Sequence, residues 1–313
     1  MSFSYGSLLR REIDAATGPV PFIGIYDVFS AAVAARHYNH LFVSGFGFAA
    51  SHYGLPDIGF ISWSDMASYV QRLRTVLPDT HLLVDIDDGY ADTEVACHVT
   101  ALMESVGASG VILEDQARPR KCGHYSGKRL MALPDFMEKL QRVLATRREM
   151  YVVARTDSHD PDDMLARITA FAEAGADAVL VDAVPDLPTL RALKMRVGRP
   201  LVCNQLAGGK SPAWSLTELG EAGASLVLYS TPCLFAAQEA IEDTMVSLRE
   251  QDGRLLQGLT TRVALPECTA VLNENLVWRH GASNGERTTD LADRSERAGS
   301  ALEHPLAGEA RAA

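Results

Sequence analysis

Acidic residues follow two apolar segments of the chain, and their spacing indicates a cation site. Asp85 ends the apolar run 81–85, Asp87 follows two residues later, and Glu114 comes directly after the run 111–113. Asp85 and Asp87 would share one face of an extended chain, because strand side chains alternate with a period of two. Three such carboxylates repel one another unless protons or a cation intervene, and oxygen ligands without a histidine pair favour Mg²⁺ or Mn²⁺ over zinc. We therefore predict a divalent cation here, with a solvated acidic rim as the alternative.

Basic residues and a cysteine accompany these acids. Arg155 ends the apolar run 151–154, so we expect its guanidinium to emerge beside the acids and to clamp a carboxylate or phosphate, the alternative being a structural ion pair. Cys122 lies between Lys121 and His124 in a glycine-flanked loop, and neighbouring cations lower the pKa of a thiol and make it reactive. A surface loop with an incidental cysteine is the alternative. The predicted catalytic residues are Lys121, Cys122, His124 and Arg155.

The elements that must position these residues are eight short apolar runs, each followed by an amphipathic helical segment. Continuously apolar strands alternating with helices are typical of a parallel sheet covered on its outer face, and eight such units predict a (β/α)8 barrel. A doubly wound open sheet is the alternative, but no Gly-x-Gly-x-x-Gly follows the first run. The predicted strands are 22–26, 41–43, 81–85, 111–113, 151–154, 178–181, 201–203 and 226–228.

Polar residues stand where several of these strands end. In such barrels the chemistry gathers at the carboxyl ends of the strands, whereas the opposite end mainly serves stability. The predicted substrate-binding residues at these ends are Tyr26, Ser44, Gly45, Phe46, Arg155, Asp182 and Asn204.

The chain continues beyond the eighth strand into helical segments that a barrel does not need. We predict a catalytic barrel over 1–255, a helical extension over 256–280 and a disordered tail over 281–313. An apolar stripe in the extension would pack on a partner subunit or, equally, on its own barrel.

Composition narrows the functional class. The net charge of −11 argues against a nucleic-acid or anionic-membrane surface. The start lacks the pattern of a signal peptide, and no apolar run reaches the ~18–20 residues of a membrane span. Five cysteines without framework spacing fit a reducing compartment. We expect a cytoplasmic protein that binds a small molecule and neither nucleic acid nor membrane.

Four motifs together resemble the isocitrate lyase/phosphoenolpyruvate mutase superfamily. They extend over roughly residues 20 to 235 in the order and spacing of that superfamily. They are Ser44-Gly45 with 54–59 (GLPDIG); 85–90 (DIDDGY); 114–116 (EDQ) with 121–124 (KCGH) and Gly127-Lys128; and 154–157 (ARTD).

The resemblance implies a barrel homotetramer with helices swapped between paired subunits, and Mg²⁺ bound directly or through water. It implies that Asp57 lies near the metal and that Ser44, Gly45 and Phe46 bind a substrate carboxylate. Arg155 and Asn204 would hold the substrate. Asp182 stands where members usually carry glutamate. The metal ligands that the resemblance implies are Asp57, Asp85, Asp87 and Glu114.

Two departures from the superfamily pattern leave the reaction open. Ala207 replaces a glutamate that lyases usually carry three positions beyond Asn204, and Asp88 and Ala91 replace the usual residues around Gly89. The loop resembles those of alkylmalate or methylisocitrate lyases and of carboxyphosphonoenolpyruvate mutases. We therefore expect a Mg²⁺-dependent carbon–carbon lyase acting on a 2-hydroxy di- or tricarboxylate. A phosphonomutase of phosphonate natural-product metabolism is the second hypothesis, and an inactive barrel kept for binding or assembly is the third.

Overall fold

The eight apolar runs pair into a closed parallel barrel, as the sequence predicts, in a computed structural model that describes residues 4–121, 123, 127–255 and 263–276. Every neighbouring pair is parallel, and β1 pairs with the last strand as well as with β2, which rules out the open sheet. Around the barrel the strands are β1 (Val20–Ile25), β10 (Leu226–Tyr229), β9 (Leu201–Gln205), β8 (Ala178–Val181), β7 (Tyr151–Thr156), β4 (Gly110–Glu114), β3 (His81–Asp85) and β2 (His40–Val43).

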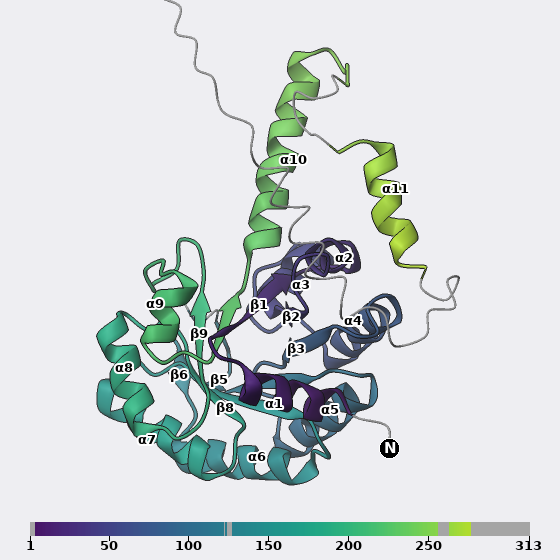
Figure 1. Ribbon diagram of the computed structural model, residues 1–313. Coiled ribbons are helices and arrows are strands. Elements are labelled where there is room, and N and C mark those ends of the chain that lie inside the picture. Colours follow the sequence, from purple (N-terminus) through teal and green to yellow (C-terminus); the bar gives the residue numbers. More distant parts are fainter. Residues whose placement is uncertain (1–3, 122, 124–126, 256–262, 277–313) are drawn as a thin grey trace, which may run out of the picture.

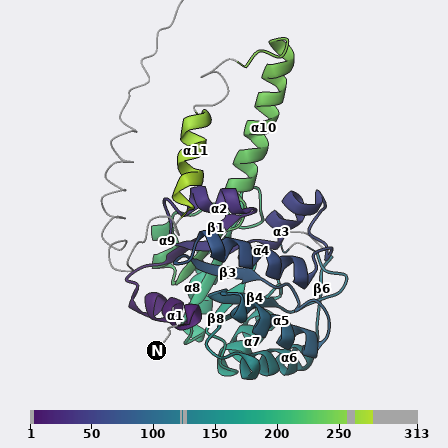
Figure 2. The ribbon, with the colours of Figure 1, turned by 90° about the vertical axis from the view of Figure 1, so that its right-hand side faces the viewer.

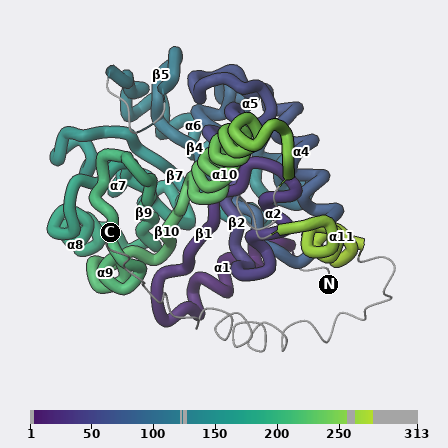
Figure 3. The backbone as a smooth tube through the Cα atoms, turned by 90° about the horizontal axis from the view of Figure 1, so that it is seen from above, coloured from purple at the N-terminus to yellow at the C-terminus, as the bar shows by residue number. Residues whose placement is uncertain are grey.

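Helices surround the ring of strands (Figure 3), and most begin at a polar capping residue. Side chains such as Asp92 and Ser215 accept a backbone N–H of the first turn, which satisfies a donor that the helix itself leaves unpaired. The outer helices are α2 (Val28–Ala34), α4 (Trp63–Val76), α5 (Thr93–Ser105), α6 (Leu133–Thr146), α7 (Pro161–Glu173), α8 (Leu187–Arg196) and α9 (Leu216–Glu221).

Alternating strand residues divide the core into two layers. Phe22, Phe42 and Leu83 belong to the cluster inside the barrel, whereas their neighbours along each strand pack under the outer helices. Helix α1 (Tyr5–Ala15) places Leu9 and Ile13 in the inner cluster. It therefore closes the amino-terminal end of the barrel (Figure 1).

Two local structures were not predicted from the sequence. The connection after β2 forms α3 (Gly45–Phe48) and a π-helical turn, η1 (Ala49–Tyr53). The loop after β4 is framed by a hairpin of β5 (Gln116–Ala117) and β6 (Arg129–Leu130). Each piece has at most five residues, too few for an apolar pattern to repeat, so sequence periodicity does not reveal it.

The C-terminal helices stand beyond the barrel on one side (Figures 1 and 2). Helix α11 (Leu265–Glu274) contacts α2, buries Val271, and pairs Glu274 with Arg36 at 3.5 Å. Helix α10 (Pro232–Glu250) buries no residue. No helix in the described part of the chain is long and apolar enough to span a membrane. The predicted tail 281–313 lies outside the described residues, and the domain boundaries stay predictions.

Candidate active site

The carboxyl ends of the strands surround a pocket at the end of the barrel opposite α1. Its free volume is about 40 Å³, room for about three water molecules. A di- or tricarboxylate therefore enters only if a lining group moves. The described lining residues that the sequence predicted as site residues are Ser44, Phe46, Asp57, Asp85, Arg155, Asp182 and Asn204.

Asp85, Asp87 and Glu114 lie close together at the ends of β3 and β4, and all three are buried. The Asp87 amide donates to Asp85 Oδ1 at 3.1 Å, and the Glu114 amide donates to the Asp87 carbonyl at 2.9 Å. Asp87 has a φ of 51°, a left-handed conformation that aspartate adopts more readily than most residues. The chain therefore turns immediately after β3 and keeps both aspartates beside Glu114.

Arg120 occupies the space between these acids, which the sequence did not predict. Its side chain is 1% exposed and forms ion pairs in three directions. Its Nη2 lies 3.0 Å from Asp87 Oδ1, its Nε lies 3.0 Å from Glu114 Oε1, and its Nη1 pairs with Asp57. Arg120 adjoins the predicted catalytic Lys121, so the basic residues of the loop indicated that a positive charge lies near the acids. Nothing in the sequence, however, indicated which of these side chains points toward them.

Burial raises the pKa of each of these acids. The pKa of Asp85 is raised, that of Asp87 lies well above its ordinary value, and that of Glu114 reaches about 7. In each case the loss of hydration is the largest cause, and the Arg120 guanidinium opposes it. The site is therefore short of positive charge, even with Arg120 in place.

The donor set of the rim fits a hard divalent cation. Both carboxylate oxygens of Asp87 and Oε2 of Glu114 are buried and accept no hydrogen bond from the described residues, although Asp87 Oδ1 and Glu114 Oε2 face the guanidinium groups of Arg120 and Arg155 as ion pairs. Carboxylate oxygens are the ligands that Mg²⁺ prefers. The acids are nevertheless spread around Arg120, so a bound cation requires that guanidinium to withdraw. Among the described residues, the one group of three or more His, Cys, Asp or Glu side chains whose ligand atoms all lie within 4.8 Å of one another is at the other end of the barrel.

The segment after β2 brings backbone against the acids. Ser44 caps α3 by accepting the Gly47 N–H at 3.2 Å. A Cβ at Gly45 would lie 3.1 Å from Asp85 Oδ2, so glycine permits this close approach. Phe46 lines the pocket, whereas Tyr26 is half-buried at the end of β1 and lies outside the described pocket lining.

Arg155 is fixed by two buried aspartates. Its Nη2 lies 3.1 Å from Asp157 Oδ1 and 2.9 Å from Asp182 Oδ2, while its Nε lies 3.5 Å from Glu114 Oε2. Asn204 donates from Nδ2 to Asp182 Oδ1 at 3.0 Å. Asp182 therefore positions Arg155 and Asn204, and each of its oxygens already contacts one of them.

The loop between β5 and β6 is seated against this cluster. Gln116 donates to the Lys121 carbonyl at 2.8 Å and accepts the Lys121 N–H at 2.9 Å. Lys128 donates to Asp157 Oδ1 at 2.7 Å and to the Gly123 carbonyl. A Cβ on Gly123 would overlap Asp182 and Arg155. Gln116, Lys128 and Asp157 had no predicted role, although the motifs included them.

Cys122 and His124, two of the predicted catalytic residues, lie outside the described residues. Lys121 is half-buried and does not line the described pocket. Gly123 does line it, so the loop backbone between the two predicted residues reaches the site.

The two departures from the superfamily pattern have different surroundings. Asp88 accepts two hydrogen bonds from Arg118, at 2.8 and 2.7 Å, so its added charge has a partner on the loop. Ala207 lies exposed in the turn after β9, outside the described pocket lining.

Comparison with known proteins agrees with this geometry. A family model described as phosphoenolpyruvate phosphomutase matches residues 9–249. Carboxyvinyl-carboxyphosphonate phosphorylmutase of Arabidopsis thaliana, a chloroplastic protein, is 31% identical over 242 residues, 74% of this chain and 71% of its own. The 2-methylisocitrate lyase of Bacillus subtilis (strain 168) is 31% identical over 253 residues, 80% of this chain and 83% of its own.

A crystal structure of 2,3-dimethylmalate lyase superposes with a TM-score of 0.82 and 25% identity, over 92% of this chain and 99% of that one. The match to the family model, the two relatives and the barrel agree with the four motifs. The chain therefore belongs to the phosphoenolpyruvate mutase/isocitrate lyase superfamily of lyases and mutases.

Proposed function

We propose that this enzyme is a Mg²⁺-dependent carbon–carbon lyase that cleaves a 2-hydroxy di- or tricarboxylate of the methylisocitrate or alkylmalate type. The observation that carries the proposal is the set of buried acids at the rim, facing Arg155 and Asn204 across one pocket. Buried carboxylate oxygens that accept no hydrogen bond suit a metal, and a fixed guanidinium suits a substrate carboxylate. The similarity to a methylisocitrate lyase and a dimethylmalate lyase supports the substrate class.

Each group of residues would have one task. Asp57, Asp85, Asp87 and Glu114 would hold Mg²⁺, directly or through water, and the bound ion would supply Lewis-acid polarisation of the substrate. Arg155 and Asn204 would orient a substrate carboxylate, and the backbone of 44–46 would bind another. In retro-aldol cleavage a base takes the proton of the substrate hydroxyl, the carbon–carbon bond breaks as the keto acid forms, and the carbanionic carbon left behind needs a proton, which we assign to the Cys122 thiol. Lys121 and His124 would set the charge around that thiol.

Loop 115–130 would exclude water during the reaction. Gly123 already lies on the Arg155–Asp182 pair, and Gln116 and Lys128 tie the loop to Asp157. Closure over the substrate protects a carbanion from solvent protons and brings the thiol to it.

Turnover assays test the substrate class. The full-length enzyme with Mg²⁺ is incubated with methylisocitrate, a series of 2-alkylmalates, oxaloacetate and phosphonopyruvate, and release of keto acid is followed. Keto-acid release from a hydroxy acid that Arg155→Met abolishes supports the proposal. Absence of carbon–carbon cleavage across the hydroxy acids, with a protein that binds Mg²⁺, contradicts it.

A phosphonomutase is the second candidate, because the family model and the Arabidopsis relative carry mutase names. The same pocket would then place Arg155 and the metal on a phosphoryl group. Phosphorus NMR of the phosphonopyruvate reaction separates the candidates, because a P–C bond made or broken shifts the phosphorus signal while lyase turnover leaves it unchanged.

We also propose a homotetramer in which α10 is covered by a partner subunit. This helix carries three apolar side chains that are between 45 and 60% exposed, namely Ile241, Met245 and Val246. An apolar patch of this kind usually marks a surface that another protein covers. Light scattering coupled to size exclusion gives the mass directly, and a monomer mass would contradict the proposal.

A further inference from the structure

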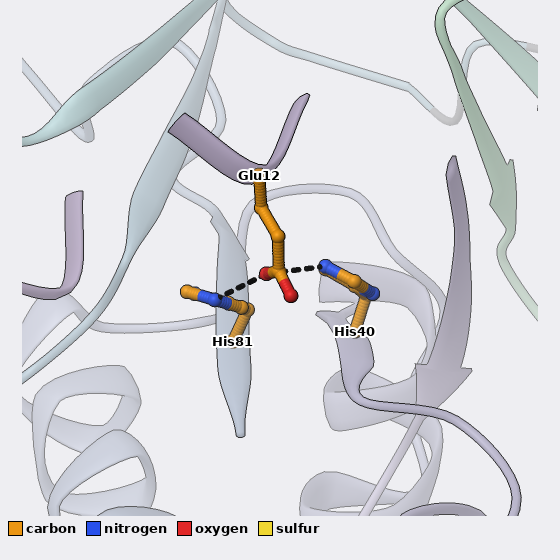
Figure 4. Close-up of side chains that lie close together, drawn as sticks. All are labelled: Glu12, His40 and His81. Atoms are coloured by element: carbon orange, nitrogen blue, oxygen red, sulfur yellow. Dashed lines mark hydrogen bonds and ion pairs between the residues drawn. The ribbon is translucent and has the colours of Figure 1, made fainter. Parts of the chain in front are cut away.

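The amino-terminal end of the barrel, away from the proposed active site, carries a second group of metal-ligating side chains. His40 begins β2 and His81 begins β3, and the strand register places them side by side. Paired residues on neighbouring parallel strands point to the same side of the sheet. Glu12 reaches them from α1, as Figure 4 shows. Three separate elements thus bring two imidazoles and a carboxylate to one point.

The three ligand atoms are close enough together to share one ion, since all lie within 4.8 Å of one another. Glu12 Oε2 lies 2.7 Å from His81 Nε2 and 3.1 Å from His40 Nε2, and the two rings stack at 5.2 Å. Bonds of ~2.0–2.2 Å around a tetrahedral zinc separate neighbouring ligand atoms by roughly 3.3–3.5 Å. The carboxylate therefore needs to withdraw by roughly 0.6–0.8 Å from His81 Nε2 and roughly 0.2–0.4 Å from His40 Nε2. Its side chain is 48% exposed, so α1 leaves it free to do so.

A supporting partner orients one of the histidines. His81 Nδ1 lies 3.2 Å from the Oγ of buried Ser109, and that oxygen also accepts the Leu82 N–H. Without an ion, Nε2 carries the proton that it shares with the Glu12 carboxylate. A cation would displace that proton, and the proton left on Nδ1 would then be donated to Ser109, which frees the Nε2 lone pair for the cation. Metal-bound histidines are usually held by such a hydrogen bond from their other nitrogen.

A pocket gives an ion access to this site, and the charges around the pocket favour a cation. A solvent-open pocket reaches two of the three ligands, Glu12 and His81, and is lined further by Tyr5, Leu8, Arg11, Ala15, Pro78 and Asp79. Two acids, Glu12 and Asp79, and one guanidinium, Arg11, border it among the described residues. The pocket also leaves room for a water as fourth ligand.

We propose that Glu12, His40 and His81 bind a divalent cation of the zinc class, separate from the Mg²⁺ proposed at the rim. Imidazole nitrogens select zinc and its chemical neighbours, whereas the oxygen-only rim selects Mg²⁺. Because α1 carries Leu9 and Ile13 into the inner core, the ion would fasten the helix that closes the barrel to the two strands beneath it. Its role is structural, since this end of the barrel mainly serves stability.

Calorimetry on full-length, tag-free protein tests the site. The protein is stripped with a chelator, saturated with Mg²⁺ to fill the rim, and titrated with Zn²⁺; tetrahedral Co²⁺ absorption gives a second readout. Glu12→Gln retains a hydrogen-bonding group, His40→Gln removes a ligand from a different element, and His98→Gln changes an exposed histidine of α5 as the control.

We expect one Zn²⁺ per chain for the native protein and the control. Each ligand variant should lose more affinity than the roughly 10–100-fold that loss of a merely supporting partner costs. Zn²⁺ should raise the melting temperature of the native protein and leave that of Glu12→Gln unchanged. Equal Zn²⁺ binding by native protein and Glu12→Gln, or no Zn²⁺ binding by the native protein, overturns the proposal and leaves a hydrogen-bonded clasp. Circular dichroism establishes that each variant is folded, and either ligand variant alone decides the outcome.

Discussion

Arg120 and the proposed Mg²⁺ would compete for the same acids, and replacing this arginine should expose the competition. In Arg120→Met the apolar side chain retains most of the length but removes the charge that faces Asp57, Asp87 and Glu114. Breaking a buried ion pair from one side typically costs about 3–5 kcal/mol, because the remaining charges stay buried without a partner. We expect the metal-free variant to lose a free energy of unfolding of about that size.

Mg²⁺ should restore much of this loss and bind the variant more tightly than the native protein. In the native protein, Mg²⁺ must displace Arg120 into water, which costs less than deleting the side chain because the guanidinium is rehydrated. With a displacement cost of about 1.4–2.8 kcal/mol, the Kd for Mg²⁺ should be about 10–100 times lower for the variant than for the native protein. At 100 times Kd, bound Mg²⁺ stabilises the variant by about 2.7 kcal/mol. Calorimetric titration with Mg²⁺ measures the affinity, and urea unfolding with and without Mg²⁺ measures the stability.

Arg118→Met is the matched control, because Arg118 lies on the same loop but pairs with Asp88 and is 41% exposed. Its Mg²⁺ affinity should equal that of the native protein. If Arg120→Met binds Mg²⁺ no more tightly than the control, Arg120 does not compete for the metal and the reasoning about the rim is wrong.

Three further predictions concern the pocket and its loop. Without divalent cations, the melting temperature should fall as pH rises from about 4.5 to about 7, because native Glu114 holds its proton up to about pH 7 while the unfolded group releases it near 4.5. Saturating Mg²⁺ should abolish this dependence, and a melting temperature that does not change with pH in the metal-free protein would contradict the prediction. Gly123→Ala should lower kcat at least tenfold with little change in melting temperature, since its Cβ overlaps Asp182 and Arg155, whereas Gly198→Ala, with open space around it, should do neither; steady-state kinetics decide. Cys122→Ser should lower turnover sharply and leave Mg²⁺ affinity unchanged by calorimetry, and full activity would remove the thiol from the mechanism.

The barrel and most of its rim could be predicted because each strand is recognisable from a short apolar run in the sequence. Apolar runs ending in Asp85, Glu114 and Arg155 fix both the sheet and the edge where those side chains meet, since parallel strands deliver their carboxyl ends together. The structure confirms the barrel and brings these residues into one region. The roles of the residues stay predictions.

The loop could not be predicted in the same way, because its side chains follow no periodicity. Three basic residues within four positions have different partners: Arg118 pairs with Asp88, Arg120 lies between the acids, and the backbone of Lys121 is held by Gln116. Only long-range contacts decide among these directions. The His40–His81 pair was missed for a related reason, because it depends on the register of two strands and on a helix that begins 35 residues before the first histidine.

The placement of Arg120 would link the proposed metal binding to the loop that carries the proposed catalytic thiol. The guanidinium is two residues from Cys122 and three from Gly123, and Gln116 holds the intervening Lys121 backbone. A cation that replaces Arg120 must therefore displace the loop segment next to the thiol or rotate the arginine out of a pocket with little free space. In either case metal binding removes the ion pairs that Arg120 gives the loop with Asp57, Asp87 and Glu114. A substrate that arrives with Mg²⁺ would find the acids free and the pocket enlarged, which orders metal and substrate binding before closure.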